Sequence, residues 1–335
     1  METTPEPTTH TVLITGAAGF IGRRLLRLLH DEHPQLQVIA TARRKPELDL
    51  LDQPGSNVRF MSLDVRSVEA IDLLRQQKVD TVVHLASVVT PGPGMDRHTM
   101  HDIDVGGTRN MLEASVAADV KKFIVTTSAA SYGYHADNPV PLTENDALRG
   151  NTEFAYSDHK RQVEDLLADF RDKHPELSQL VFRPGFILGP DCENQITALF
   201  NKPVILGIRG SETPFTIIWD EDVARCIARG IVTDKTGIYN QAGDGVVTFP
   251  EMAQMLGKPF VAVPVSVVKS ALWLFKRLGV SQYGPEQVNF LRYRPVLSNR
   301  ALKEDFGYTP GRTSLECFLE YTRGRGLLKN EPVNP

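Results

Sequence analysis

Near its beginning the chain reads Val12-Leu13-Ile14-Thr15-Gly16-Ala17-Ala18-Gly19-Phe20-Ile21-Gly22, an apolar strand that runs directly into the first turn of a helix. In such a turn the first glycine permits the tight reversal, the second lets backbone N–H groups approach a pyrophosphate, and the third allows close helix–strand packing. The positive end of the helix then faces the phosphates. An ordinary glycine-rich turn is the alternative, but the position between the first strand and the first helix favours a dinucleotide site.

From residue 11 to about residue 182, short β-branched runs alternate with amphipathic stretches, the pattern of βαβ units around a parallel sheet. This alternation predicts an α/β fold with a doubly wound parallel sheet. The predicted strands are Thr11–Thr15, Gln37–Thr41, Val58–Leu63, Thr81–His84, Lys122–Thr127 and Gln179–Arg183. The predicted helices are Phe20–His30, Val68–Gln77, Thr99–Ala118 and Thr152–His174.

After Pro184 the rhythm loosens and Gly/Pro-rich connections become frequent. We therefore predict a dinucleotide-binding domain over residues 1–185 and a smaller, mainly helical substrate lobe over residues 186–330. A helix at Glu221–Val232 and a strand at Gly237–Asn240 suggest that residues 220–245 return to the first domain.

Composition excludes several classes of protein. The 335 residues are 41% hydrophobic and 23% charged, which excludes a disordered or fibrous chain. A formal net charge of −4 provides no attraction to phosphate backbones, so we expect no nucleic-acid partner. The acidic start and the absence of an apolar run of about 20 residues argue against a signal peptide and a membrane span. The 3 cysteines show no CxxC spacing, so we expect a cytoplasmic protein without a zinc knuckle or a disulfide framework.

The end of the second predicted strand indicates the cofactor. An acidic residue there would bind the two ribose hydroxyls of NAD, whereas arginine accommodates the 2′-phosphate of NADP. Here Ala42 is followed by Arg43, Arg44 and Lys45. A solvated basic loop is the alternative interpretation, but the guanidinium fork suits phosphate, so we predict NADP, with NAD possible.

Three polar residues form a candidate catalytic set. Tyr156 and Lys160 are four residues apart and so share one face of a predicted helix. An adjacent ammonium favours the phenolate form of a tyrosine, as proton transfer near neutral pH requires. Ser128 follows the fifth predicted strand, at the carboxyl edge of the sheet where such folds bind ligands.

Together these motifs resemble the extended branch of the short-chain dehydrogenase/reductase family, which includes NAD-dependent epimerase/dehydratases and 3β-hydroxysteroid-dehydrogenase-like reductases. The resemblance covers residues 15 to about 325 and implies a Rossmann-like sheet. Beyond the glycine turn and the set Ser128, Tyr156 and Lys160, the matching segments are Asp64-Val65, His84-Leu85-Ala86-Ser87, Arg183-Pro184-Gly185 and Trp219-Asp220-Glu221-Asp222-Val223-Ala224.

The resemblance implies an enzyme in which Tyr156 exchanges a proton with a carbonyl or alcohol oxygen while hydride moves to or from the nicotinamide. Ser128 would hydrogen-bond the same oxygen, and Lys160 would hold the nicotinamide ribose. The implied cofactor contacts are Gly16, Ala18, Gly19, Phe20, Ile21, Gly22, Arg43, Arg44, Asp64, Val65, Leu85, Ala86, Ser87, Tyr156, Lys160, Pro184 and Gly185.

The chain departs from the nucleotide-sugar members of that family. Residues 186–190 and 214–218 lack the Asn and Arg that serve the substrate diphosphate there, although Arg209 or Arg292 could replace them. We therefore predict an NADP(H)-dependent oxidoreductase acting on a hydrophobic small molecule. A nucleotide-sugar epimerase or dehydratase and a non-catalytic NADP-binding regulator are the alternatives.

Three further expectations concern assembly, metals and one apolar helix. The resemblance and the apolar residues of Thr152–His174 predict a homodimer through that helix and Thr99–Ala118. His98, His101, Asp102 and Asp104 are interpreted as a hydrated helix start, and no metal is predicted. Trp273-Leu274-Phe275, within 267–278, is assigned to a core or pocket-lining helix in preference to a membrane-facing one.

Overall fold

The computed structural model describes residues 10–92, 94–279, 284–285 and 287–329. Its centre is a seven-stranded sheet in the order β11-β6-β5-β4-β1-β2-β3, in which each recorded neighbouring pair from β6 to β3 is parallel. The strands are β1 Thr11–Thr15, β2 Gln37–Ala42, β3 Val58–Ser62, β4 Thr81–His84, β5 Lys122–Thr126, β6 Ser178–Pro184 and β11 Gly237–Gln241.

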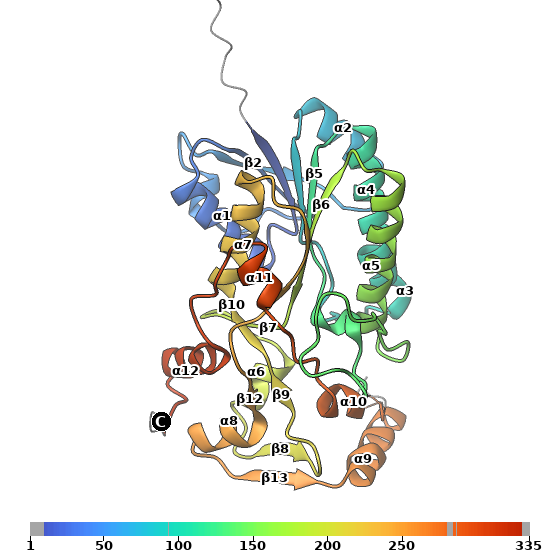
Figure 1. The fold of residues 1–335 in the computed structure, drawn as a ribbon, viewed down its shortest axis with the longest axis vertical. Helices are drawn as coiled ribbons and strands as arrows, with labels where there is room; N and C mark the ends of the chain where they lie inside the picture. The colour runs from blue at the N-terminus through green and yellow to red at the C-terminus, as the bar shows by residue number, and fades with distance from the viewer. Residues whose placement is uncertain (1–9, 93, 280–283, 286, 330–335) are drawn as a thin grey trace, which may run out of the picture. The chain divides into compact units, whose positions relative to one another are not determined.

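The strand order reverses between β1 and β4, which makes the sheet doubly wound and confirms the predicted fold class. In Figure 1, α1 and α7 lie on one face, and α2, α4 and α5 lie on the other. These helices are α1 Phe20–Glu32, α2 Glu69–Gln76, α4 Gly107–Ala117, α5 Ala155–Lys173 and α7 Asp220–Val232. Because both faces are covered, the inner strands are almost entirely buried, as in β1, where apolar residues lie between two buried threonines.

The prediction of one continuous helix over Thr99–Ala118 is wrong. The chain instead forms α3 Arg97–His101, a π-helical segment at Asp102–Gly106, and then α4. Two adjacent glycines lie at the junction, and a Cβ on Gly107 would stand 2.6 Å from the Val65 side chain. The local change of helical winding therefore accompanies close packing against the loop that follows β3.

The chain divides into two compact units. Unit 1 comprises Met1–Thr127, Gln162–Phe182 and Val223–Ile238, and unit 2 comprises Ser128–Arg161, Arg183–Asp222 and Tyr239–Pro335. The chain returns to unit 1 near residue 223, within the range 220–245 expected from the sequence. Residues 128–161, in contrast, group with unit 2, although the predicted domain boundary lay at residue 185. The segment that carries the three candidate catalytic residues thus belongs to unit 2.

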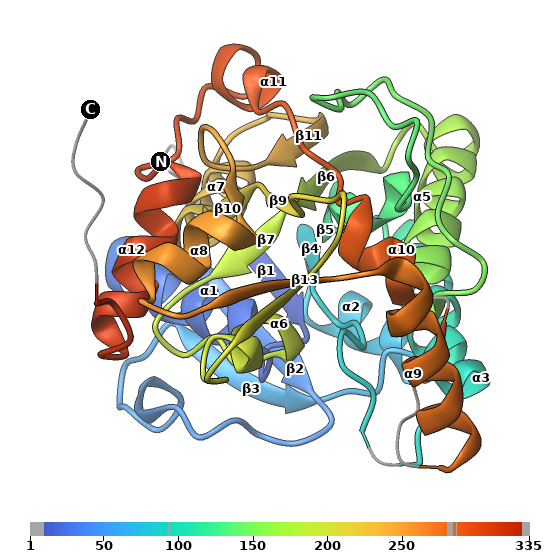
Figure 2. The same cartoon turned by 90° about the horizontal axis from the view of Figure 1, so that it is seen from below.

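Unit 2 is built from small sheets and short helices, with β13 leading into α9 (Figure 2). Its remaining strands are β7 Phe186–Leu188, β8 Ile205–Ile208, β9 Pro214–Phe215, β10 Ile217–Trp219, β12 Val247–Thr248 and β13 Phe260–Val263. Its remaining helices are α6 Gln195–Leu199, α8 Phe249–Met255, α9 Val265–Arg277, α10 Gln287–Arg292, α11 Arg300–Glu304 and α12 Ser314–Gly324. Short 3-10 helices occur at Asp49–Leu51 and Ala129–Tyr132.

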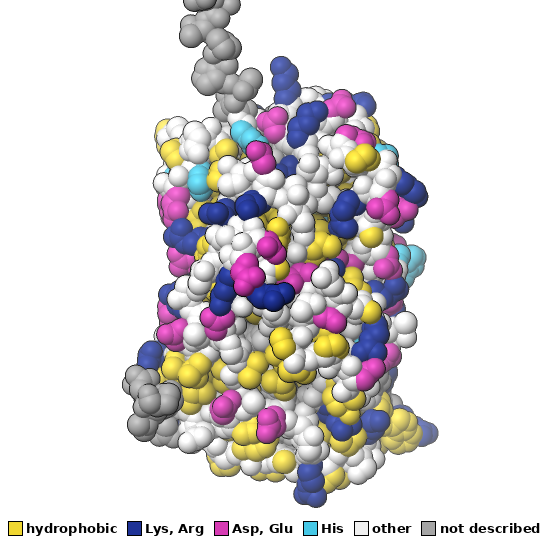
Figure 3. All heavy atoms as spheres, in the orientation of Figure 1, with side chains coloured by type: hydrophobic (Ala, Val, Ile, Leu, Met, Phe, Trp, Pro, Cys, Tyr) yellow, Lys and Arg dark blue, Asp and Glu magenta, His cyan; other side chains and the backbone are white. Residues whose placement is uncertain are grey.

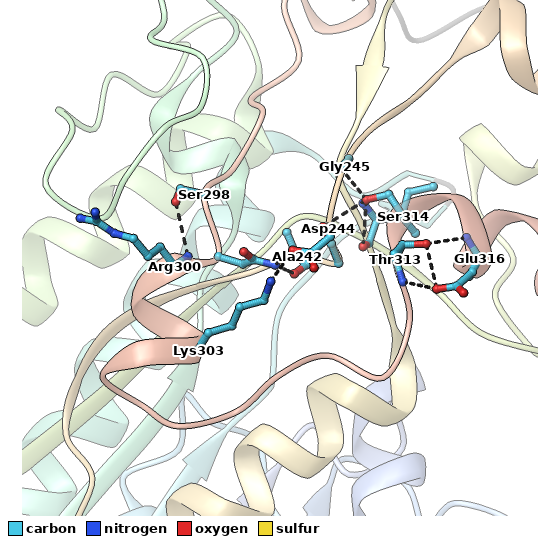
Figure 4. A network of polar contacts seen from close by, with 12 residues as sticks. Ala242, Asp244, Gly245, Ser298, Arg300, Lys303, Thr313, Ser314 and Glu316 are labelled. Carbon is cyan, nitrogen blue, oxygen red and sulfur yellow. Dashed lines mark hydrogen bonds and ion pairs between the residues drawn. The ribbon is translucent and has the colours of Figure 1, made fainter. Parts of the chain in front are cut away.

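The start of α12 is tied to the loop after β11 by buried polar contacts (Figure 4). Ser314 Oγ accepts a hydrogen bond from the Ile217 amide at 3.0 Å and donates one to the Gly245 carbonyl at 2.8 Å. Thr313 and Glu316 form a capping box at the helix N-terminus. Lys303 forms an ion pair with Asp244 at 2.5 Å, so the same loop also holds α11.

The helix α9 does not lie in the core, which corrects the expectation for Trp273-Leu274-Phe275. None of its residues is buried, and Trp273 is 52% exposed. In Figure 3, hydrophobic and basic side chains adjoin at the end of the unit where α9 lies. Among the described residues, no helix combines the length and apolar character needed to cross a bilayer.

The apolar residues of α5 are used within the chain itself. Val163, Leu166, Leu167 and Phe170 are all buried in the core cluster that lies against the sheet. Of the five apolar residues on which the dimer expectation depended, these four are therefore covered within the chain, and Phe154 is half-buried. The homodimer stays a prediction from the family resemblance alone.

We predict that Ser314→Ala destabilises the protein by about 1–3 kcal/mol, because the buried Ile217 amide loses its acceptor. Urea unfolding followed by circular dichroism measures this difference. Ser178→Ala, at an exposed position, is the matched control and should change the unfolding free energy by less than about 0.5 kcal/mol. Equal effects of the two substitutions would contradict the assigned role of Ser314.

Candidate functional site

The glycine turn in unit 1 packs without space for side chains. Gly16 has φ +67°, a left-handed conformation, and a Cβ there would lie 2.6 Å from the Leu85 carbonyl carbon. A Cβ on Gly22 would lie 2.4 Å from the Gly16 carbonyl oxygen. Both positions therefore require glycine for steric reasons, as the sequence predicts.

Side-chain hydrogen bonds hold the loop after β4 against this turn. Thr15 Oγ1 accepts hydrogen bonds from the Leu85 and Ala86 amides at 3.2 and 3.3 Å. His84 is buried and bridges the hydroxyls of Thr15 and Thr108, at 2.9 and 3.1 Å. The histidine thus fixes the spacing of β1, β4 and α4, a role that sequence reasoning did not assign.

The helix end above the turn is available to an anion. Gly19 is the N-cap of α1, with φ −73° and no side-chain cap hydrogen bond. The first amides of a helix lack intrahelical partners and attract phosphate. Ser87 follows Leu85 and Ala86, which pack on the turn, and its Oγ is buried without a hydrogen-bond partner in the described structure. These features fit the pyrophosphate and adjoining ribose of a dinucleotide, with Ala18, Phe20 and Ile21 lining the turn.

The residues expected at the adenosine end also lie in unit 1. Arg43 and Arg44 follow β2 and are exposed, and neither forms an ion pair within the described residues, whereas Lys45 pairs with Asp52. Asp64 is held by Arg66, with Nη2 2.7 Å from Oδ2. This pairing lowers the pKa of the Asp64 carboxyl to about 2.

Val65, the neighbour of Asp64, packs toward α4. Its carbonyl accepts a hydrogen bond from Asn110 Nδ2 at 2.7 Å, and its side chain limits the space at Gly107. The Asp64-Val65 segment is thus fixed from two sides, by Arg66 on one residue and by α4 on the other.

In unit 2, Ser128 and the first turn of α5 are tied together. Ser128 caps the 3-10 helix at Ala129–Tyr132, and its Oγ accepts a hydrogen bond from the Ala130 amide at 3.1 Å. Ser157 Oγ donates to the Ala130 carbonyl at 2.7 Å and accepts from the Asn151 amide at 3.0 Å. Because Ser157 is the neighbour of Tyr156, this bridge positions the serine loop beside the start of α5.

Tyr156 and Lys160 share one face of α5, as predicted. Lys160 is 5% exposed, and its Nζ lies 5.8 Å from the centre of the Tyr156 ring. Tyr156 itself is half-buried. The structure therefore brings an ammonium close to the half-buried Tyr156 ring, in the same unit as Ser128.

The segment Arg183-Pro184-Gly185 is strongly anchored. Arg183 Nη1 donates to the Tyr132 hydroxyl and to the Glu144 carbonyl, each at 2.9 Å. A Cβ on Gly185 would stand 2.7 Å from the Thr216 carbonyl oxygen. Thr216 Oγ1 and both amide atoms of Gln241 are buried without hydrogen-bond partners in the described structure, and the Gln241 carbonyl accepts from the Gly185 amide.

The acidic start of α7 has a structural role. Asp222 Oδ1 accepts hydrogen bonds from the Tyr308 hydroxyl at 2.7 Å and from the Gly311 amide at 2.9 Å. Packing at Gly189 is similarly close, since a Cβ there would stand 2.3 Å from the Asp220 carboxyl carbon. These acids anchor the C-terminal segment of unit 2, a function that the family pattern alone does not reveal.

An aromatic cluster that the sequence did not predict lies next to the candidate tyrosine, Tyr156. Phe154 lies 6.3 Å from Tyr156 and 5.4 Å from Phe290 between ring centres. Tyr134 lies 5.0 Å from Phe290, and the Arg294 guanidinium carbon lies 4.6 Å from the centre of the Phe290 ring. Its members are up to 160 residues apart along the chain, by subtraction of their numbers, so no local periodicity could have indicated it.

The acidic and histidine residues near α3 do not form a metal centre. His98 Nδ1 and Asp102 pair with each other at 3.4 Å on the surface, and Asp104 accepts a hydrogen bond from the Val88 amide at 2.8 Å. Within the described residues, no three His, Cys, Asp or Glu side chains gather in a suitable geometry.

Comparison with known proteins gives a family match over most of unit 1 and part of unit 2. Residues 12–225 match the model of the NAD dependent epimerase/dehydratase family. An uncharacterized protein of Mycobacterium tuberculosis is 24% identical over 321 residues, covering 94% of this chain and 84% of that protein. A UDP-glucose 4-epimerase of Yersinia enterocolitica is 29% identical over 194 residues, covering 54% of this chain and 57% of that enzyme.

A solved structure confirms the fold over nearly the whole length. The dTDP-glucose 4,6-dehydratase of Bacillus anthracis, in complex with NAD, aligns with a TM-score of 0.73 at 17% identity. The alignment covers 95% of this chain and 96% of that enzyme. At this identity the similarity concerns the fold.

We predict opposite behaviour for two alanine substitutions in the glycine turn. Gly22→Ala should destabilise the protein by about 1–3 kcal/mol, because the new methyl overlaps backbone atoms. A Cβ on Gly19 would meet only the Gly16 oxygen, at 3.1 Å, so Gly19→Ala should retain most of the stability. The methyl would instead obstruct the phosphates and weaken dinucleotide binding at least about tenfold.

Thermal unfolding and calorimetric titration with NADPH, performed on both variants, separate these two effects. Wild-type dinucleotide affinity in Gly19→Ala would argue against phosphate binding at this turn.

Proposed function

Because the chain belongs to the NAD-dependent epimerase/dehydratase family, an enzyme family that uses nicotinamide dinucleotides, we propose that it is an NADP(H)-dependent oxidoreductase. The proposed reaction interconverts a carbonyl and an alcohol on a hydrophobic small molecule by hydride transfer. Tyr156 is the proposed acid/base residue, with Ser128 and Lys160 as its partners.

The observation that carries this proposal is the approach of Lys160 to the Tyr156 ring, with Ser128 tied to the same helix start. A general acid must stand where it can reach the reacting oxygen, and its proton affinity must suit neutral pH. A buried ammonium 5.8 Å from the ring favours the phenolate electrostatically. A non-catalytic regulator would not require this arrangement.

In reduction, the Tyr156 hydroxyl gives its proton to the carbonyl oxygen as hydride reaches the carbonyl carbon; in oxidation, the phenolate takes the proton from the alcohol. The Ser128 hydroxyl donates a hydrogen bond to the same oxygen and so stabilises the charge that develops on it. Lys160 would hold the ribose hydroxyls of the bound dinucleotide, and its ammonium would stabilise the phenolate left on Tyr156 until a proton from solvent restores the phenol. The dinucleotide, when bound, supplies or accepts the hydride.

Arg43 and Arg44 support NADP as the preferred cofactor. They follow β2, beside which dinucleotide-binding folds of this kind bind the adenosine ribose, and Ala42 stands where an NAD-binding acid would be expected. The related dehydratase of known structure is described with NAD, so the preference is a property proposed for this chain.

We predict that Arg43→Ala weakens NADPH binding by about 1.5–3 kcal/mol and leaves NADH binding nearly unchanged, because only NADPH carries the 2′-phosphate. Isothermal titration calorimetry with both cofactors measures this. Arg27→Ala removes an equal charge from an exposed position of α1 and is the matched control. Equal wild-type affinities for NADPH and NADH would overturn the assignment.

We predict that Tyr156→Phe lowers turnover by about 10²–10⁴-fold while NADPH affinity stays near the wild-type value, since only the transition state uses the phenolic proton. Lys160→Ala should reduce both quantities. NADPH absorbance with a panel of carbonyl compounds gives the rates. Tyr308→Phe, which removes a phenol bonded to Asp222, is the control, and an equal loss in that variant would remove the special role of Tyr156.

The apolar side chains of unit 2 support a hydrophobic substrate. Phe215 lies 5.5 Å from Phe186 and 5.1 Å from Phe249 between ring centres. Together with the cluster of Tyr134, Phe154 and Phe290, they add aromatic rings to the apolar side chains of this unit. The exposed helix α9 does not contribute to it, contrary to the sequence expectation.

A nucleotide-sugar epimerase or dehydratase is the second candidate, favoured by the 29% identity to a UDP-glucose 4-epimerase over 194 residues. Thermal unfolding in the presence of UDP distinguishes the two. Strong stabilisation by UDP favours the nucleotide-sugar reaction, and its absence favours the hydrophobic substrate.

A further inference from the structure

Arg294 of unit 2 presents a cation without an anion. Its guanidinium carbon lies 4.1 Å from the ring centre of Phe215 and 4.6 Å from that of Phe290. Nη1 is buried without a hydrogen-bond partner, and no carboxylate of the described residues forms an ion pair with this side chain. Within the described part of the chain, this side chain makes cation–π contacts with the two rings.

This arrangement is costly in the absence of a ligand. A buried charge requires a compensating partner, and aromatic faces replace only part of the lost hydration. Burial lowers the pKa of the Arg294 guanidinium to about 10, and the nearby Tyr134 acts in the opposite direction. The side chain is thus still charged at neutral pH. Arg294 as a whole is only partly buried, and Nη1 is its buried atom without a partner among the described residues, so an anionic group from outside the chain could supply one.

Contact with the two rings through the face of the guanidinium would leave its N–H edge for recognition. Stacking on rings uses the flat faces of the group, whereas its N–H donors point outward in the plane. Two parallel N–H donors match the two oxygens of a carboxylate or a phosphate. Arg292, two residues earlier, has a buried Nε without a partner and lies 4.6 Å from the Tyr293 ring centre, which adds positive charge to the same segment.

The cation is linked to the candidate catalytic tyrosine through aromatic rings. Phe290 contacts both Arg294 and Phe154, and Phe154 contacts Tyr156. The helix α10, which carries Phe290, lies beside the loop that leads into α5 in both ribbon views (Figures 1 and 2). An apolar molecule that packs on Phe154 and Phe290 would reach from the Tyr156 hydroxyl toward Arg294.

We propose that Arg294 binds an anionic group, a carboxylate or a phosphate ester, on the substrate, whose apolar part packs on Phe154 and Phe290. The inference rests on the proposed function and deepens it: the substrate class is an apolar carbonyl or alcohol compound that carries one acidic group. Arg294 then fixes the end of the substrate that is remote from the reacting oxygen.

The test measures binding and does not depend on turnover. Calorimetry on the full chain compares phenylacetate and phenyl phosphate with the uncharged phenylacetamide. We expect both anions to bind and the amide to bind at least tenfold more weakly. Arg294→Met should weaken binding of both anions at least tenfold. The control is Arg300→Gln, which changes an exposed arginine that pairs with Glu304 at 3.8 Å among the described residues, and it should bind the anions as tightly as the wild type.

Stability provides an independent readout. Methionine fills the space between the two rings without a charge, so Arg294→Met should raise the unfolding temperature of the ligand-free protein and abolish the upward shift that phenylacetate causes. Arg294→Lys keeps the charge without the fork and should show intermediate anion affinity, so it tests the proposal should the methionine variant fail to fold. Anion affinity that is unchanged in Arg294→Met or Arg294→Lys, or amide affinity equal to that of the acid, would overturn the proposal.

Two further binding measurements ask which kind of molecule carries the anion and whether anion binding is independent of the proposed catalytic role of Tyr156. Binding of UDP-glucose that is lost in Arg294→Met would support the anion site and assign it to a nucleotide diphosphate. Tyr156→Phe should keep full affinity for phenylacetate, so anion binding survives even where the assignment of Tyr156 as acid/base fails.

Discussion

The approach of the glycine turn to the loop after β4 is the constraint on which the rest of the structure depends. Gly16 touches the backbone of Leu85 and Ala86, and Thr15 hydrogen-bonds the amides of the same two residues. Any side chain at Gly16 would separate β1 from β4, the two strands at which the strand order reverses. At the end of the same turn, the N-cap Gly19 makes no side-chain cap hydrogen bond, which leaves the α1 N-terminus for the proposed phosphate contact.

Much of unit 1 follows from local sequence. Alternating β-branched strands and amphipathic helices predict β1 and β4 with their observed ends, because such patterns report burial on a regular element. The interruption at Asp102–Gly106 was not predictable in this way, since it reflects contact between Gly107 and Val65 from a distant loop. For α9, apolar composition suggested burial, but burial depends on a neighbour, and the sequence of a helix does not state whether one is present.

In the candidate site, too, some features follow from local sequence and others depend on tertiary contacts. Ser128, Tyr156 and Lys160 are recognisable because strand ends and helical spacing fix their relation, and all three lie in one unit. The bridge from Ser157 to Ala130 and the cluster around Phe290 depend on tertiary contacts between segments far apart in the chain. The proposed substrate class rests on Arg294, which has no carboxylate partner among the described residues. Local sequence could not predict this, because it does not show which arginines lack a counterion.

The most direct test of the account is transfer of label from deuterated NADPH, carrying deuterium on the transferable C4 position, to a phenyl ketone that bears a carboxylate. The account predicts an alcohol with one deuterium on its carbinol carbon, formed in equal amount to the NADP⁺ produced, and no product in Tyr156→Phe. Epimerisation of UDP-glucose without net NADPH consumption, together with no label in any reduced ketone, would contradict it.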